Sequence, residues 1–119
     1  MYVAAPVRAE FQQHFVDRVR DIRLGAAYDY SCDVGSLVSQ EQLDKVIRHV
    51  GDAVTNGANV VTGGSRRPDL GPWFFERTVL EGVRPGMLVA DEETFGPVVA
   101  MYSVADDAAA VAAANATPY

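Results

Sequence analysis

Hydrophobic residues recur at three- and four-residue spacing in two long stretches, a pattern typical of amphipathic helices. The first stretch follows Pro6 and ends before Gly25. Its predicted buried stripe is Val7, Phe11, Phe15, Val19 and Ile22. The second begins at Ser39, which has the spacing of a capping box with Gln42, and ends before Gly57. Its predicted stripe is Leu43, Val46, Ile47, Val50 and Val54.

Two apolar runs predict strands between and after these helices. Residues 59–62 form a short β-branched run closed by two glycines. Residues 97–104 are nearly continuously apolar, which is typical of a strand buried on both faces of a parallel sheet. Asp106 and Asp107 then favour the start of an alanine-rich helix. The alternation predicts an α/β fold with mostly parallel strands packed against helices.

Composition narrows the possible functions. The chain has 119 residues and a net charge of -6, so we expect one domain or less, no nucleic-acid partner and no anionic membrane partner. No apolar run approaches the roughly 18 residues of a membrane span, and a cytoplasmic location is the default. Cys32 is the only cysteine, and His14 and His49 lack metal-ligand spacing, so we predict no metal site.

One segment carries a specific family resemblance. Residues 91–98 read Asp-Glu-Glu-Thr-Phe-Gly-Pro-Val, which resembles the Glu-Glu-x-Phe-Gly-Pro signature of aldehyde dehydrogenases. Further stretches resemble the same family in register: residues 33–39, 57–64 and 75–80. The resemblance extends over the whole chain. The sequences of residues 34–43 and 67–80 are most similar to the succinate-semialdehyde dehydrogenase branch.

The resemblance implies a mechanism that uses NAD or NADP. In the family a cysteine thiolate attacks the aldehyde, hydride passes to the nicotinamide, and water activated by a glutamate hydrolyses the thioester. Glu93 matches the glutamate that accepts hydrogen bonds from the nicotinamide ribose, a role that suits an acceptor-only carboxylate. Phe95 matches the aromatic residue that lies against the nicotinamide region. Glu92 is expected to be solvated.

The resemblance also implies that residues 1–119 are a fragment of the aldehyde dehydrogenase catalytic domain. The nucleophilic cysteine, the glutamate base and the dinucleotide-binding domain are expected outside it, so no catalytic residue is assigned and the chain alone should be inactive. Cys32 lies away from any family cysteine motif and is interpreted as a bystander. In a full-length enzyme we expect a small-molecule aldehyde substrate, succinate semialdehyde above others, and a homo-oligomer. The alternative is a non-catalytic remnant or interaction module of the same fold.

Overall fold

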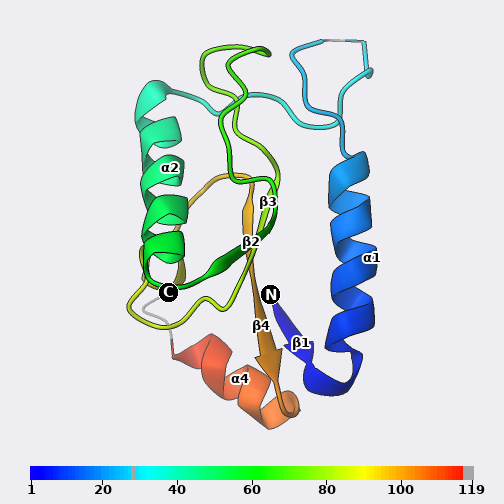
Figure 1. Cartoon of the computed structure of the whole chain (residues 1–119), viewed down its shortest axis with the longest axis vertical. Coiled ribbons are helices and arrows are strands. Elements are labelled where there is room, and N and C mark those ends of the chain that lie inside the picture. Colours follow the sequence, from blue (N-terminus) through cyan, green and yellow to red (C-terminus); the bar gives the residue numbers. More distant parts are fainter. Residues whose placement is uncertain (28, 117–119) are drawn as a thin grey trace.

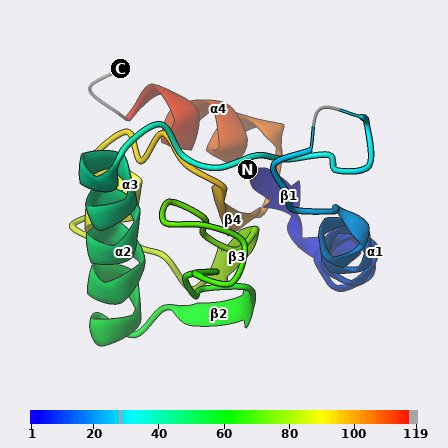
Figure 2. The same ribbon diagram turned by 90° about the horizontal axis from the view of Figure 1, so that it is seen from above.

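A four-stranded sheet lies between two long helices in the computed structural model, which describes residues 1–27 and 29–116. Helix α1 (Arg8–Asp21) and helix α2 (Gln40–Thr55) lie on opposite sides of the sheet (Figures 1 and 2). Both helices were predicted from their periodicity, and both are confirmed. The result is a three-layer α/β/α arrangement, which buries both faces of the sheet.

The sheet is mostly parallel, as predicted. Its strand order is β1 (Tyr2–Ala4), β4 (Val98–Val104), β3 (Thr78–Glu81) and β2 (Asn59–Thr62). The β1–β4 and β4–β3 pairs are parallel, whereas β2 is antiparallel to β3. Strand β4 is therefore central, and the segment that precedes it enters the sheet between two neighbours.

Three short helices complete the described chain. A 3-10 turn, η1 (Ala5–Val7), leads into α1. Helix α3 (Leu88–Asp91) packs against α2, and helix α4 (Asp107–Asn115) follows β4. The Asp106 side chain accepts a hydrogen bond from the Ala109 backbone N–H at 2.8 Å, which confirms the expected helix start.

Two apolar layers hold the sheet between its helices, because successive side chains of a strand point to opposite faces. In β3, Val79 faces α1 and Leu80 faces α2. The layer under α1 contains Val3, Val16, Val19, Val79 and Met101. The larger layer under α2 contains Leu43, Val46, Val50, Ala53, Ala58, Phe75, Leu80, Val83 and Met87.

The predicted helical stripes are partly wrong. Of the first predicted stripe, Val7 lies in η1 and is 53% exposed, and Phe11 is 38% exposed; the buried residues of α1 are Val16 and Val19. Of the second predicted stripe, Ile47 and Val54 are exposed, whereas His49 and Ala53, which the stripe did not include, are buried. A periodic pattern identifies a helix but leaves its rotation about its axis uncertain by about one residue.

Strand β4 is also less buried than predicted. Only Met101 is fully buried within it, and Ser103 is exposed. The strand lies centrally, but its neighbour β1 has only three residues and α4 buries none of its own. Because β1 and α4 are short, they cover little of the C-terminal half of β4.

Candidate functional site

The loop of residues 92–97 joins α3, which ends at Asp91, to β4, which begins at Val98. It carries the two predicted site residues, Glu93 and Phe95, and both are exposed. Phe95 is 74% exposed and has a φ of 47°. A bulky residue in this left-handed region is strained, and such strain clusters at functional sites.

The side chain of Gln42 holds the backbone of this loop against α2. Its Nε2 atom donates to the carbonyl oxygens of Thr94 at 2.7 Å and Phe95 at 2.8 Å. The Ser39 hydroxyl accepts from the Gln42 backbone N–H at 3.2 Å, as the capping box predicted. The expected return contact from the Gln42 side chain to Ser39 is not found among the described residues. Gln42 anchors the distant loop instead of its own helix start.

The loop approaches α2 so closely that a glycine is required at position 96. A Cβ atom on Gly96 would lie 2.5 Å from Cγ2 of Val46, and Val46 is fully buried. A β-branched side chain in a helix has one strongly preferred rotamer, so Val46 cannot easily move aside. Gly96 therefore lets the loop lie directly on the helix.

A buried histidine contacts the loop from the same helix. His49 is 0% exposed; its Nδ1 lies 3.1 Å from the Thr94 hydroxyl oxygen. Its Nε2 lies 3.4 Å from Oε2 of Glu92, outside the geometry of a hydrogen bond. Burial lowers the pKa of His49, and the Glu92 carboxylate opposes that shift. Glu92 was expected to be solvated, and it is exposed, with 48% of its side chain accessible, while one of its carboxylate oxygens comes near this histidine.

An open apolar groove of about 600 Å³ begins next to the loop. Gly96 and Pro97 line it, together with residues of α1, β3 and the 34–37 segment. Glu93 and Phe95 are not among its lining residues, so they lie on the adjoining surface. The loop therefore connects an exposed carboxylate and ring to the wall of an apolar groove.

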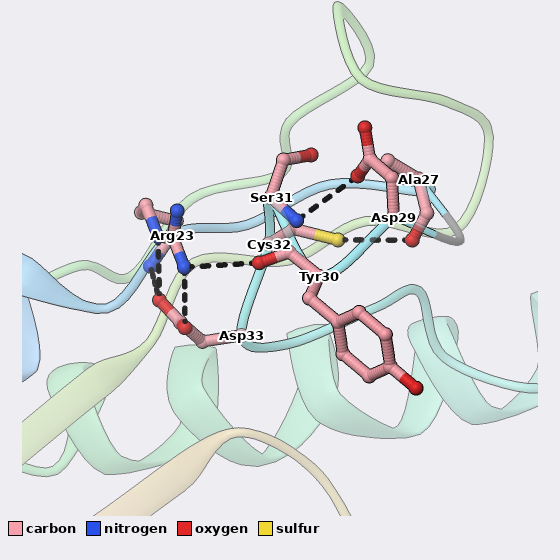
Figure 3. Close-up of polar contacts among 7 residues, drawn as sticks. All are labelled: Arg23, Ala27, Asp29, Tyr30, Ser31, Cys32 and Asp33. Carbon is pink, nitrogen blue, oxygen red and sulfur yellow. Dashed lines mark hydrogen bonds and ion pairs between the residues drawn. The ribbon is translucent and has the colours of Figure 1, made fainter.

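The loop that contains Cys32 is organised by an ion pair rather than by the thiol (Figure 3). Arg23 donates to both carboxylate oxygens of Asp33, through Nε at 3.0 Å and Nη2 at 2.9 Å. Hydrogen bonding to Arg23 lowers the pKa of Asp33 to about 2. The Cys32 thiol donates to the Ala27 carbonyl oxygen at 3.4 Å, within the same loop. The bystander assignment of Cys32 stays a prediction.

Sequence reasoning missed Gln42 and His49 as residues of this site. It interpreted Gln42 as half of a helix cap and His49 as a surface or satisfied histidine. The available signal was their spacing, because positions 42, 46 and 49 share one helical face. His14, by contrast, has a side chain that is 77% exposed.

Across residues 1–27 and 29–116, no three His, Cys, Asp or Glu side chains are grouped to hold a metal ion. In the same part of the chain, no helix combines the length and apolarity needed to cross a bilayer.

The chain is similar in sequence to proteins named as succinate-semialdehyde dehydrogenases. A protein from Mycobacterium tuberculosis, provisionally named succinate-semialdehyde dehydrogenase [NADP(+)] 2, is 52% identical over 119 residues, which are 100% of this chain and 23% of that protein. The succinate-semialdehyde dehydrogenase [NADP(+)] 2 of Schizosaccharomyces pombe is 40% identical over 97% of this chain and 23% of its own length. The chain thus spans about a quarter of the relatives that it matches.

Solved structures give the same picture. The succinate-semialdehyde dehydrogenase of Burkholderia pseudomallei superposes with a TM-score of 0.91 at 37% identity, covering 98% of this chain and 24% of that one. A betaine aldehyde dehydrogenase of Staphylococcus aureus in complex with NAD+ superposes with a TM-score of 0.92 at 33% identity, covering 99% and 24%. The model of the aldehyde dehydrogenase family matches residues 1–119, and the chain therefore belongs to that family.

Proposed function

We propose that residues 1–119 form part of the catalytic domain of an NAD(P)-dependent aldehyde dehydrogenase that oxidises succinate semialdehyde to the carboxylic acid. The family match over the whole chain supports the reaction class. The names of the M. tuberculosis and S. pombe relatives support the substrate and favour NADP, and a structural neighbour binds NAD+. Because the chain covers 23% of those relatives, the nucleophile and the dinucleotide-binding domain are assigned to other segments of such an enzyme.

The contribution of this chain is to position the nicotinamide end of the cofactor. Glu93 would accept hydrogen bonds from the two ribose hydroxyls, because an ionised carboxylate offers only acceptor sites. Phe95 would lie against the nicotinamide ring. The single observation that carries this proposal is that both exposed side chains lie on one loop whose backbone Gln42 ties to α2.

The residues present fit such a ligand. The Glu93 carboxylate is exposed, and the Phe95 ring is exposed in a strained backbone conformation that only a well-anchored loop can maintain. When bound, the dinucleotide supplies the hydride acceptor. The residues of this chain then act by orientation, since a fixed ribose and ring hold the reacting carbon in line with the aldehyde.

The test uses a chimeric enzyme in which this chain replaces the matching segment of the M. tuberculosis relative. Glu93→Gln should raise the dinucleotide KM and lower kcat/KM at least about tenfold, since hydrogen bonds to a charged group are worth about 1.5–3 kcal/mol. Glu10→Gln is the matched control, because Glu10 is an exposed glutamate on α1. An unchanged rate and cofactor affinity in Glu93→Gln would refute the ribose role.

The same chimera separates the proposal from a non-catalytic remnant. A chimera that folds, binds dinucleotide through the host's own domain and oxidises succinate semialdehyde supports a working catalytic segment. A folded chimera without turnover favours the remnant.

A further inference from the structure

We propose that His49 is a positioning residue for the loop of residues 92–97, and that it fixes the direction of Glu93 by contacting Glu92 and Thr94. The inference rests on the proposed function of Glu93 and Phe95. It adds a residue in the middle of α2 that touches neither the ribose nor the nicotinamide.

The contacts of the imidazole ring bracket Glu93. One ring nitrogen lies 3.1 Å from the hydroxyl oxygen of Thr94, and the other lies 3.4 Å from a carboxylate oxygen of Glu92. Glu92 has an extended backbone, with φ −124° and ψ 148°. Side chains alternate along extended backbone, so two neighbours held toward α2 direct Glu93 away from the helix. Glu93 is exposed, as that direction requires.

The position of His49 calls for an explanation beyond packing. Its side chain is completely buried at a position where the neighbouring turns of α2 place Leu43, Val46, Val50 and Ala53. A buried polar ring costs free energy unless it is hydrogen-bonded, so an apolar residue would serve a purely structural purpose better. The ring meets its partner on the loop, which links the burial of His49 to the conformation of residues 92–94.

His49 completes a set of anchors along one face of α2. Gln42 holds the carbonyl oxygens of Thr94 and Phe95, and Val46 receives the closely packed Gly96. These anchors hold the backbone on the C-terminal side of Glu93. His49 is the described α2 side chain that also comes near Glu92, so its ring contacts the residues on both sides of Glu93.

The test compares His49→Asn with His49→Leu in the chimeric enzyme. The amide of asparagine can occupy the position of Nδ1 and keep the bond to Thr94, whereas leucine keeps apolar volume and loses the bond. His49→Leu should raise the dinucleotide Kd and KM about 5- to 150-fold, the range expected when the partly buried Thr94 hydroxyl loses its hydrogen-bond partner. The aldehyde KM should change little, and His49→Asn should recover most of the dinucleotide affinity.

Thr94→Val removes the other partner and keeps the test independent of how well His49 variants fold. Thr94→Val should lose as much dinucleotide affinity as His49→Leu. The double variant should lose no more affinity than whichever single variant loses more, because both changes break the same contact. Thr94→Ser retains the hydroxyl and should bind dinucleotide normally. A Thr94→Val enzyme with unchanged dinucleotide affinity would overturn the proposal.

A final comparison separates this inference from the function on which it rests. If His49 acts through Glu93, His49→Leu should have no further effect on dinucleotide affinity in an enzyme that already carries Glu93→Gln. An equal loss in that background overturns the positioning role. If Glu93→Gln weakens binding but His49→Leu does not, the positioning role fails and the ribose role stands. If neither variant changes binding, both proposals fail.

Discussion

Replacing Gly96 by alanine tests whether the loop of residues 92–97 lies directly on α2. The added Cβ would lie 2.5 Å from Cγ2 of Val46. No rotation of a β-branched residue on a helix relieves this contact cheaply, so the loop or the core must shift. Overpacking of this kind costs about 1–3 kcal/mol. Because Gly96 does not have a positive φ, the steric contact is the only expected cost.

Shortening the partner gives the matched variant. Val46→Ala alone removes two buried methyl groups and should cost about 1.6 kcal/mol, at roughly 0.8 kcal/mol per group. In the double variant, the methyl group added by Gly96→Ala occupies the space left by Cγ2 of Val46. The double variant should therefore be no less stable than Val46→Ala, and the two changes should be coupled by about 1–3 kcal/mol.

The assay is amide hydrogen exchange of the chimeric enzyme, followed in the peptide that spans residues 92–101. Exchange reports local opening, so Gly96→Ala should speed it about 5- to 150-fold, and Val46→Ala should return Gly96→Ala to the rate of Val46→Ala alone. If Gly96→Ala exchanged as slowly as the parent, or if the two changes were additive, the loop would not be packed on Val46 as described.

Two further predictions concern the Cys32 loop and the isolated chain. Hydrogen bonding to Arg23 lowers the pKa of Asp33 to about 2, so the ion pair contributes above the unfolded pKa, about 3.9, and is lost as the pH falls through about 2. Proteolysis of this loop in the chimera should be equally slow at about pH 8 and about pH 5, and faster at both values in Asp33→Asn. If the parent loop became easier to cleave between about pH 8 and about pH 5, the lowered pKa of Asp33 would be wrong. The isolated chain leaves its apolar groove and the edges of β1 and β2 uncovered, so it should unfold without a cooperative thermal transition. A sharp, mesophile-like transition in calorimetry would show that it folds alone.

The sequence by itself determined the longer helices, strands β2 and β4, and the motif of the candidate site, because those signals act over a few residues. Ser39 and Asp106 start their helices through local hydrogen bonds, and Gly57 follows α2 with a φ of 93°. The motif around Glu93 and Phe95 could be recognised without coordinates. The helix and strand periods then predicted a mostly parallel α/β sheet, which the structure confirms.

Only the tertiary structure decided what holds the site in place. Gln42 reaches carbonyl groups 52 and 53 positions away, and His49 meets Thr94 across 45 positions. The same glutamine satisfies a local capping pattern, so its sequence context favours the wrong partner. Which distant groups meet depends on how the loop before β4 returns to α2, and no local propensity encodes that path. The antiparallel pairing of β2 and the rotation of each helix on the sheet depend on the same long-range packing.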